Sequence, residues 1–235
     1  MKALLAGLCM LTGAVMAAEP DFAILREKLV EEVRQYAGYA GDAPFSDAVM
    51  DAMNTVERHK FVPPGEVRYA YENRPLSIGY GQTISQPYIV ALMTDLLEPE
   101  AGDVVLEVGT GSGYQAAILS GLVDHVYTIE IIEALARQAR PRIDRLGYDN
   151  VTTRLGDGYF GWKEHAPFDA IIVTAASSHV PPPLIEQLKP GGRMVIPVGG
   201  RFVTQHLLLL EKNEDGEVIA RQIGAVRFVP LTGEH

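Results

Sequence analysis

Cysteine is almost absent from this chain. The 235 residues include one cysteine, Cys9, which lies in an N-terminal segment that we expect to be removed. The remaining protein would then have neither a disulfide nor a thiol nucleophile. The histidines lack the spacing of metal ligands, so we predict no metal site; the positions considered are His59, His125, His165, His179 and His206.

An excess of basic residues is also missing. The chain carries 20 lysines and arginines against 30 aspartates and glutamates, for a net charge of −10. A protein that wraps a phosphate backbone needs a basic face, so we expect no nucleic-acid partner, although a local basic patch stays open. The sequence has no internal repeat and no low-complexity segment that would indicate another class of fold.

The one long uncharged run lies at the N-terminus. Lys2 is followed by apolar and small residues up to Ala18, and then Glu19-Pro-Asp21 ends the pattern. A basic start, a short apolar core and small terminal residues describe a secretory signal peptide over residues 1–18, and the run is too short for a confident membrane span. A misassigned start codon or a buried helix are the alternatives. We therefore expect an exported, for example periplasmic, protein without stable membrane association after cleavage.

Residues 19–235 are expected to form a single domain. Apolar residues at helical spacing predict a helix over 21–37, and Ser46 is placed to cap a second helix. Residues 59–84 have no regular pattern, and such a long loop in a compact domain is usually functional. Pro87 suits the first position of a helix that continues to Leu97. The part 19–98 is therefore predicted to hold helices and an active-site loop.

The part 99–235 alternates strands and helices. This pattern predicts an α/β fold with a mostly parallel sheet, helices on both faces and an antiparallel hairpin at the edge. A turn is predicted at Lys189–Gly192, and the hairpin turn at Asn213–Gly216. The expected strands are 104–108, 125–130, 151–155, 168–173, 193–198, 205–212 and 217–229, and the expected helices are 114–122, 131–146 and 183–188.

A glycine loop follows the first of these strands. Val104–Val108 reads as a buried strand, and Gly109, Gly111 and Gly113 then alternate with other residues up to Tyr114. Such glycines allow a sharp turn and a close approach of the backbone to a ligand. The loop fails the dinucleotide pattern G-x-G-x-x-G and lacks the Lys-Ser/Thr pair of a phosphate loop. The alternative interpretation of residues 109–113 is a plain strand-to-helix turn without a ligand.

Acidic residues mark three strand ends where a ligand would bind in such a sheet. Glu107 precedes the glycines, and an acidic residue followed by G-x-G-x-G is similar to the S-adenosylmethionine loop of methyltransferases. Glu130 could accept hydrogen bonds from ribose hydroxyls, or be a solvated strand-end acid. Asp157, which lies between Gly156 and Gly158, could contact an adenine amino group, or belong to an Asp-Gly turn.

Six segments together resemble the protein-L-isoaspartate O-methyltransferase family, over about residues 46–232. The resemblance implies a Rossmann-like methyltransferase fold. It implies methyl transfer from S-adenosyl-L-methionine to the free α-carboxylate of isoaspartyl residues in damaged proteins, which initiates repair. The segments are 58–63, Tyr80-Gly-Gln-Thr-Ile-Ser-Gln-Pro87, 106–114, 156–158, 168–175 and Arg227-Phe-Val-Pro-Leu-Thr232.

The resemblance also implies the site residues. Ser85 would be the active-site residue, and the alternative is that it caps the helix after Pro87. The acceptor carboxylate is already an anion at neutral pH, so orientation and not a general base is required. The cofactor-binding residues would be Gln82, Thr83, Ile84, Glu107, Gly109, Thr110, Gly111, Ser112, Gly113, Glu130, Asp157, Gly158 and Thr232.

Two other functions are considered beside the repair enzyme. One is a carboxyl or small-molecule methyltransferase with the same cofactor site, and the other is an exported binding protein that keeps the fold. The family is ordinarily cytoplasmic, so the export-like segment is a departure from it, and a cytoplasmic location is the alternative. The expected partners are isoaspartyl proteins and peptides, and we expect a monomer.

Overall fold

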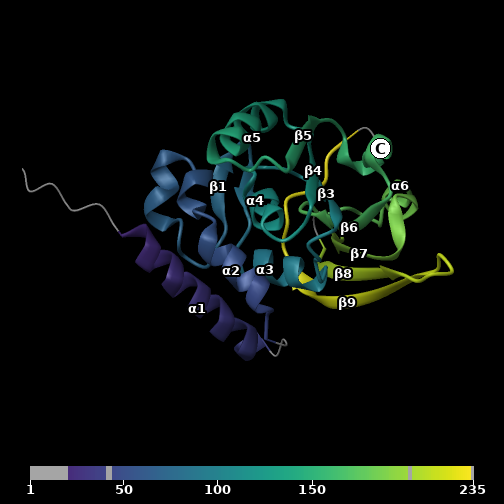
Figure 1. The fold of residues 1–235 in the computed structure, drawn as a ribbon, viewed down its shortest axis with the longest axis horizontal. Coiled ribbons are helices and arrows are strands. Elements are labelled where there is room, and N and C mark those ends of the chain that lie inside the picture. Colours follow the sequence, from purple (N-terminus) through teal and green to yellow (C-terminus); the bar gives the residue numbers. More distant parts are fainter. Residues whose placement is uncertain (1–20, 41–43, 201–202, 234–235) are drawn as a thin grey trace, which may run out of the picture.

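The computed structural model describes residues 21–40, 44–200 and 203–233 of the chain. The signal-peptide prediction for residues 1–18 therefore lies outside the described residues. Within the described ranges, no helix is both long and apolar enough to cross a membrane. Figure 1 shows the elements, which are α1 (Phe22–Ala40), α2 (Asp47–Thr55), η1 (Arg58–Phe61), η2 (Pro64–Tyr69), β1 (Leu76–Gly79), β2 (Gln82–Ile84), α3 (Pro87–Leu96), β3 (Val104–Val108), α4 (Tyr114–Ser120), β4 (His125–Glu130), α5 (Glu133–Leu146), β5 (Val151–Leu155), η3 (Gly158–Phe160), η4 (Lys163–His165), β6 (Phe168–Val173), α6 (Pro182–Glu186), β7 (Leu188–Val198), β8 (Gln205–Lys212) and β9 (Val218–Val226).

The main sheet has seven strands in the order β5-β4-β3-β6-β7-β8-β9. The strands from β5 to β7 run parallel, and β8 and β9 are antiparallel. The order reverses between β3 and β6, which is where ligands bind in sheets of this kind, outside the carboxyl ends of the strands. The predicted mostly parallel sheet with an antiparallel hairpin at its edge is confirmed.

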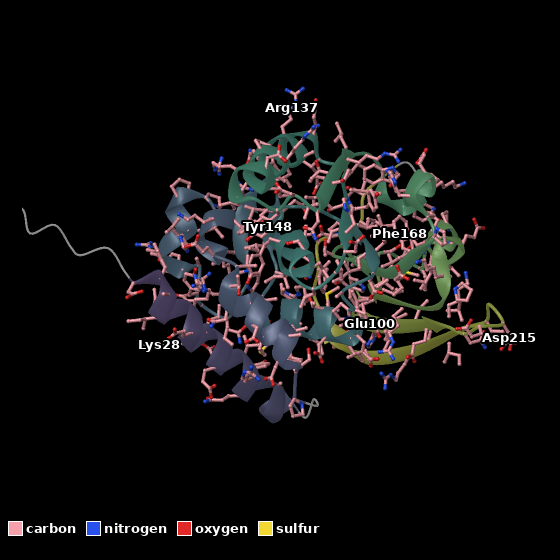
Figure 2. All side chains as sticks on the ribbon, in the orientation of Figure 1. Lys28, Glu100, Arg137, Tyr148, Phe168 and Asp215 are labelled. Atoms are coloured by element: carbon pink, nitrogen blue, oxygen red, sulfur yellow. The ribbon has the colours of Figure 1, made fainter. Side chains whose placement is uncertain are left out.

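Both faces of the sheet are buried, because successive side chains of a strand point to opposite faces. On one face, Val105, Ile172 and Val195 join a core cluster that also contains the buried residues of α1 to α5. On the other face, Leu106, Ile171 and Met194 join a second cluster with α6 residues and the half-buried Trp162. Figure 2 shows the contrast between Phe168, inside the sheet layers, and Lys28, Arg137 and Asp215, which point outward.

The N-terminal helices follow their predicted starts. Ser46 is the N-cap of α2, and its hydroxyl accepts a hydrogen bond from Val49 N at 3.4 Å. Pro87 is the first residue of α3. Helix α1 packs against α3 through Tyr36 and Tyr88, whose ring centroids lie 4.6 Å apart.

A small hairpin occupies the stretch that was predicted to be irregular. Strands β1 and β2 pair antiparallel around Tyr80 and Gly81, whose φ angles are 55° and 73°. Positive φ at both central residues is the geometry of a two-residue hairpin turn. A tyrosine rarely adopts that conformation, so the sequence carried no turn signal of the Asn-Gly kind. The hairpin fixes the segment 82–87 that leads into α3.

Strand β7 is longer than predicted. Residues 189–192, which the sequence indicated as a turn, belong to β7, and the register with β6 shifts between Phe168 and Ala170. Gly192 permits this, because a Cβ atom there would lie 2.7 Å from the carbonyl oxygen of Asp169. The prediction of a turn was wrong since glycine here serves close packing between strands.

The C-terminal segment turns back across the molecule after β9 (Figure 1). Ala176 N donates to the carbonyl of Val229 at 2.8 Å, and Leu231 N donates to the carbonyl of Ala176 at 2.7 Å. The predicted last strand, 217–229, therefore ends at Val226, and residues beyond it cross the carboxyl end of β6. This crossing brings the terminal segment to the side of the sheet where the glycine loop lies.

Candidate functional site

The glycine loop 109–113 turns directly at the carboxyl end of β3. Gly109 N and Thr110 N both donate to the carbonyl of Ile129, at 2.8 and 3.1 Å. Gly109 has a φ of 101°, and a Cβ atom on it would lie 2.3 Å from Thr174 Oγ1. Only glycine fits this position, because the loop must pass tightly against the end of β6.

Glu130 holds the loop from the neighbouring strand. Its Oε2 accepts from Gly111 N at 2.7 Å, and its Oε1 accepts from Ile132 N at 2.8 Å. The side chain is buried, so the alternative of a solvated strand-end acid is wrong. Each carboxylate oxygen can accept a further hydrogen bond. The predicted contact with ribose hydroxyls stays a prediction, and the observed role is to shape the loop.

Glu107 is a fully buried carboxyl group in the middle of a hydroxyl network. Its Oε2 accepts from Thr128 Oγ1, which lies 2.6 Å from Thr110 Oγ1. Its Oε1 is buried and has no hydrogen-bond partner among the described residues. Burial raises the pKa of Glu107 to about 8. With this oxygen the carboxyl group can form one more hydrogen bond to a ligand, as donor when protonated and as acceptor when ionised.

Two pockets are lined in part by the segment 82–86. The inner pocket opens at the strand ends, and its lining includes Ile78, Gln82, Thr83, Gly109, Gly111, Glu130, Gly158, Thr174 and Thr232. The outer pocket has a volume of about 480 Å³ and is lined by Tyr36, Pro75, Thr83, Ser85, Gln86, Tyr88, Ile89, Thr174 and residues 225–229. The terminal segment therefore contributes to both pockets, and α1 to the outer one.

A small junction pocket connects these two sets of residues. Ser85 belongs to both the outer and the junction pockets, and Thr83 and Thr174 line all three. The wall of the junction pocket consists of Thr83, Ile84, Ser85, Val90, Glu107, Gly109, Thr110, Gly111, Ser112, Tyr114, Gln115 and Thr174. Eight of the predicted site residues thus line this one pocket, and they come from β2, the segment that follows it, β3 and the loop after β3.

Ser85 does not cap α3. The N-cap residue is Gln86, and no side-chain cap comes from it. Asn73 supplies an acceptor instead, because its Oδ1 accepts from Tyr88 N at 3.0 Å. The capping alternative for Ser85 is therefore wrong, and its half-buried side chain faces the pockets.

Two predicted residues line neither the inner nor the junction pocket. Asp157 caps η3, since its Oδ1 accepts from Tyr159 N at 3.0 Å, while the adjacent Gly158 lines the inner pocket. The structure therefore shows the turn role of Asp157, and its adenine contact stays a prediction. Gly113, with a φ of 88°, precedes α4 and packs against Ile143.

Three residues of the site were not singled out from the sequence. Thr174 Oγ1 lies 3.0 Å from the carbonyl of Val108 and 2.7 Å from that of Gly109. Arg142 Nη1 donates to the carbonyl of Ser112 at 2.8 Å, and Arg58 Nη2 donates to that of Ser85 at 2.9 Å. Thr174 directly follows a predicted strand, so its place at the carboxyl edge was a usable signal. No signal in the sequence marked the two arginine contacts, because their carbonyl partners are distant in sequence.

A family model described as protein-L-isoaspartate(D-aspartate) O-methyltransferase matches residues 25–235. A protein-L-isoaspartate O-methyltransferase 2 of Syntrophobacter fumaroxidans is 61% identical over 227 residues, covering 95% of this chain and 92% of the relative. A protein-L-isoaspartate O-methyltransferase 1 of Cupriavidus necator is 60% identical over 227 residues, covering 97% of this chain and 88% of the relative. Both similarities extend over nearly the whole of each chain.

Solved structures show the same relationship. A protein-L-isoaspartate O-methyltransferase structure aligns with a TM-score of 0.80 at 30% identity, covering 88% of this chain and 66% of that one. A Plasmodium falciparum structure of the same description, in complex with S-adenosyl-L-homocysteine, aligns with a TM-score of 0.73 at 26% identity, covering 88% and 98%. From the family model and these relatives it follows that the chain belongs to the protein-L-isoaspartate(D-aspartate) O-methyltransferase family.

Proposed function

We propose that this protein transfers a methyl group from S-adenosyl-L-methionine to the free α-carboxylate of L-isoaspartyl residues in damaged proteins. One observation supports this above others: Thr83 and Thr174 line the inner, outer and junction pockets alike. Two ligands that occupied the inner and outer pockets would meet beside Ser85. Such an arrangement serves a group transfer between two bound molecules, which a binding protein with a single ligand would not need.

The donors and acceptors of the inner and junction pockets fit the proposed cofactor. Glu130 would hold the ribose, and the loop 109–113 would lie against the methionine part, where glycine allows close approach. Once the carboxyl group of Glu107 has lost its proton, its unpartnered Oε1 would accept a hydrogen bond from the cofactor's ammonium group. Gly158 and Thr232 would close the wall. When bound, S-adenosyl-L-methionine supplies an already activated methyl group, so the protein needs no Lewis acid or base to activate it.

The acceptor makes equally modest demands on the protein. An α-carboxyl group has an unperturbed pKa of about 3.5, so it is an anion at neutral pH without a general base. The task left to Ser85 is to donate one hydrogen bond that fixes the carboxylate in line with the methyl group. Tyr36, Tyr88 and Phe228 line the outer pocket around it. Their rings reduce contact with water and so strengthen that hydrogen bond.

The segment after β9 suits a substrate of variable sequence. Strand β9 is the last strand of the sheet, and residues 225–229 line the outer pocket. An extended peptide can add to such an edge through main-chain hydrogen bonds, with little demand on its side chains. We propose that this edge holds the isoaspartyl peptide, so that different damaged proteins can be accepted.

Repair of a synthetic isoaspartyl peptide tests the proposed function. With enzyme and cofactor, the methyl ester should form, close to a succinimide and reopen partly to the normal aspartyl peptide. Chromatography of the two isomers follows the conversion over time. Cofactor consumption with a small carboxylic acid, and none with the peptide, would instead favour a small-molecule methyltransferase.

We also propose that the enzyme acts outside the cytoplasm. The uncharged run that ends at Ala18 has the composition of a signal peptide. Protein recovered from its native cells should then begin near Ala18 or Glu19 and be found in the exported fraction. Intact mass spectrometry of fractionated cells measures this, and full-length protein in the cytosolic fraction would rule the proposal out.

A further inference from the structure

Arg58 is a buried cation that contacts the backbone of Ser85. It lies on η1 and is fully buried. Its Nη2 donates to the carbonyl oxygen of Ser85 at 2.9 Å and to that of Arg74 at 3.4 Å. Its guanidinium carbon lies 4.9 Å from the ring centroid of Tyr114, the first residue of α4 after the glycine loop. One side chain thus contacts the segments on both sides of the junction pocket.

Burial of the Arg58 side chain is energetically unfavourable for the fold. Its Nε and Nη1 are buried without a hydrogen-bond partner among the described residues. Burial lowers the pKa of Arg58 to about 10, so the group still carries its charge at neutral pH. The described residues form no ion pair with it. Taking such a charge out of water costs free energy, and no ion pair with a described residue offsets that cost here. Fold stability alone is therefore a poor reason for an arginine here.

The guanidinium group of Arg58 contacts the backbone carbonyl of Ser85, the proposed active-site residue. A charge-assisted hydrogen bond to the Ser85 carbonyl fixes the peptide plane from which the serine side chain projects. Tyr114 lines the junction pocket together with Ser85, and the guanidinium lies against its ring. The position of the serine relative to the glycine loop is therefore set through Arg58. Methyl transfer depends on such placement, where a shift of about 1 Å can cost a hundredfold in rate.

We propose that Arg58 is a positioning residue for methyl transfer, which holds the Ser85 segment in register with the cofactor loop. This inference rests on the proposed function. Arg58 touches neither ligand directly, since it lines neither the inner, the outer nor the junction pocket. It acts through Ser85 and Tyr114, so its removal should affect the rate of transfer more than the binding of the cofactor.

The test compares Arg58→Met with wild type and with Arg34→Met. Arg34 bridges α1 and α2 through Asp47 at 3.2 Å and lines none of the three pockets, so it controls for the loss of one arginine contact between elements. For Arg58→Met we expect a single-turnover rate at saturating cofactor that is about tenfold to a hundredfold lower. The dissociation constant of S-adenosyl-L-homocysteine, from calorimetry, should stay within about twofold, and the denaturant midpoint should be equal or higher. Arg34→Met should keep the wild-type rate.

A single-turnover rate of Arg58→Met within about twofold of wild type would overturn the inference. If that variant does not fold, Arg58→Lys decides, because it keeps the charge but lacks the planar fork. A normal rate in folded Arg58→Lys would also overturn the inference, and a slowed rate with unchanged cofactor affinity would support it. The proposed function fails separately, since wild-type protein would then not methylate the isoaspartyl peptide at all.

Discussion

At the scale of single residues, the hydroxyl of Ser85 is the group on which the proposed chemistry depends. Because Asn73 serves α3 as acceptor, the Ser85 side chain is not needed for the helix. Its replacement should separate rate from stability.

Ser85→Ala should lower the single-turnover rate by about tenfold to a hundredfold, which corresponds to one lost hydrogen bond to a charged group. The loss of stability should stay below the roughly 1 kcal/mol that a missing N-cap costs. The pH–rate profile should keep its shape, because no proton moves to or from the serine. A clearly destabilised variant with a normal rate would contradict this role.

Glu107 should make the stability of the ligand-free protein depend on pH. Its folded pKa of about 8 lies above the ordinary value of 4.5, so between these values the native state binds more protons than the unfolded state. The free energy of unfolding therefore has its full value below about pH 4.5 and falls as pH rises through about 8. Glu107→Gln removes the titration, so its denaturant midpoint should lack this decline. Parallel losses in both proteins from about pH 5 to 8 would show that Glu107 is not the cause.

Residue-level prediction from the sequence succeeded where a residue ends a strand. Glu130 and the glycines could be placed because parallel strands deliver their carboxyl ends to one edge. The role of Arg58 could not be predicted, because its carbonyl partner is 27 residues away; the segment 58–63 supported only the family resemblance. The choice between capping and catalysis at Ser85 was also unresolvable, because the cap comes from Asn73, outside the local motif.

At the scale of elements, helix α5 supports the glycine loop 109–113. Arg142 lies on this helix and donates to the carbonyl of Ser112, so it fixes the loop at its fourth residue. Its burial lowers the pKa of Arg142 from its ordinary value, but an arginine remains charged at neutral pH.

Arg142→Met should weaken binding of S-adenosyl-L-homocysteine about fivefold, since one hydrogen bond contributes about 1 kcal/mol. Calorimetry measures the effect, and Arg140→Met, at an exposed position of the same helix, serves as the control. Equal affinities of the two variants would remove Arg142 from the support of the loop.

Elements with strong local patterns were predicted well, and those that depend on close packing were not. The buried strands β3 and β6 stand out as short apolar runs between turns. The β1–β2 hairpin and the start of β7 were missed because each depends on a conformation that tertiary contacts impose. Tyr80 adopts a positive φ, and Gly192 approaches the Asp169 carbonyl.

At the scale of the whole molecule, the fold brings three distant parts of the chain to one edge of the sheet. The segment 82–85, the glycine loop and residues 225–232 all line the connected pockets. The alternation of strands and helices was enough to predict the sheet. The alternation did not predict the return of the C-terminal segment over β6, which depends on hydrogen bonds between Ala176 and residues 229–231. Only the family resemblance implied it, through the cofactor-binding role of Thr232.

Methyl transfer to the isoaspartyl α-carboxylate is tested most directly by the ratio of kcat/KM for an isoaspartyl peptide to that for the aspartyl peptide of the same sequence. In the aspartyl peptide the free carboxylate is displaced by one methylene group relative to the isoaspartyl peptide. Such a displacement can lower the rate about a hundredfold when catalysis depends on orientation. We therefore expect a preference of about a hundredfold or more for the isoaspartyl peptide. Equal values for the two peptides, or transfer to neither, would contradict it.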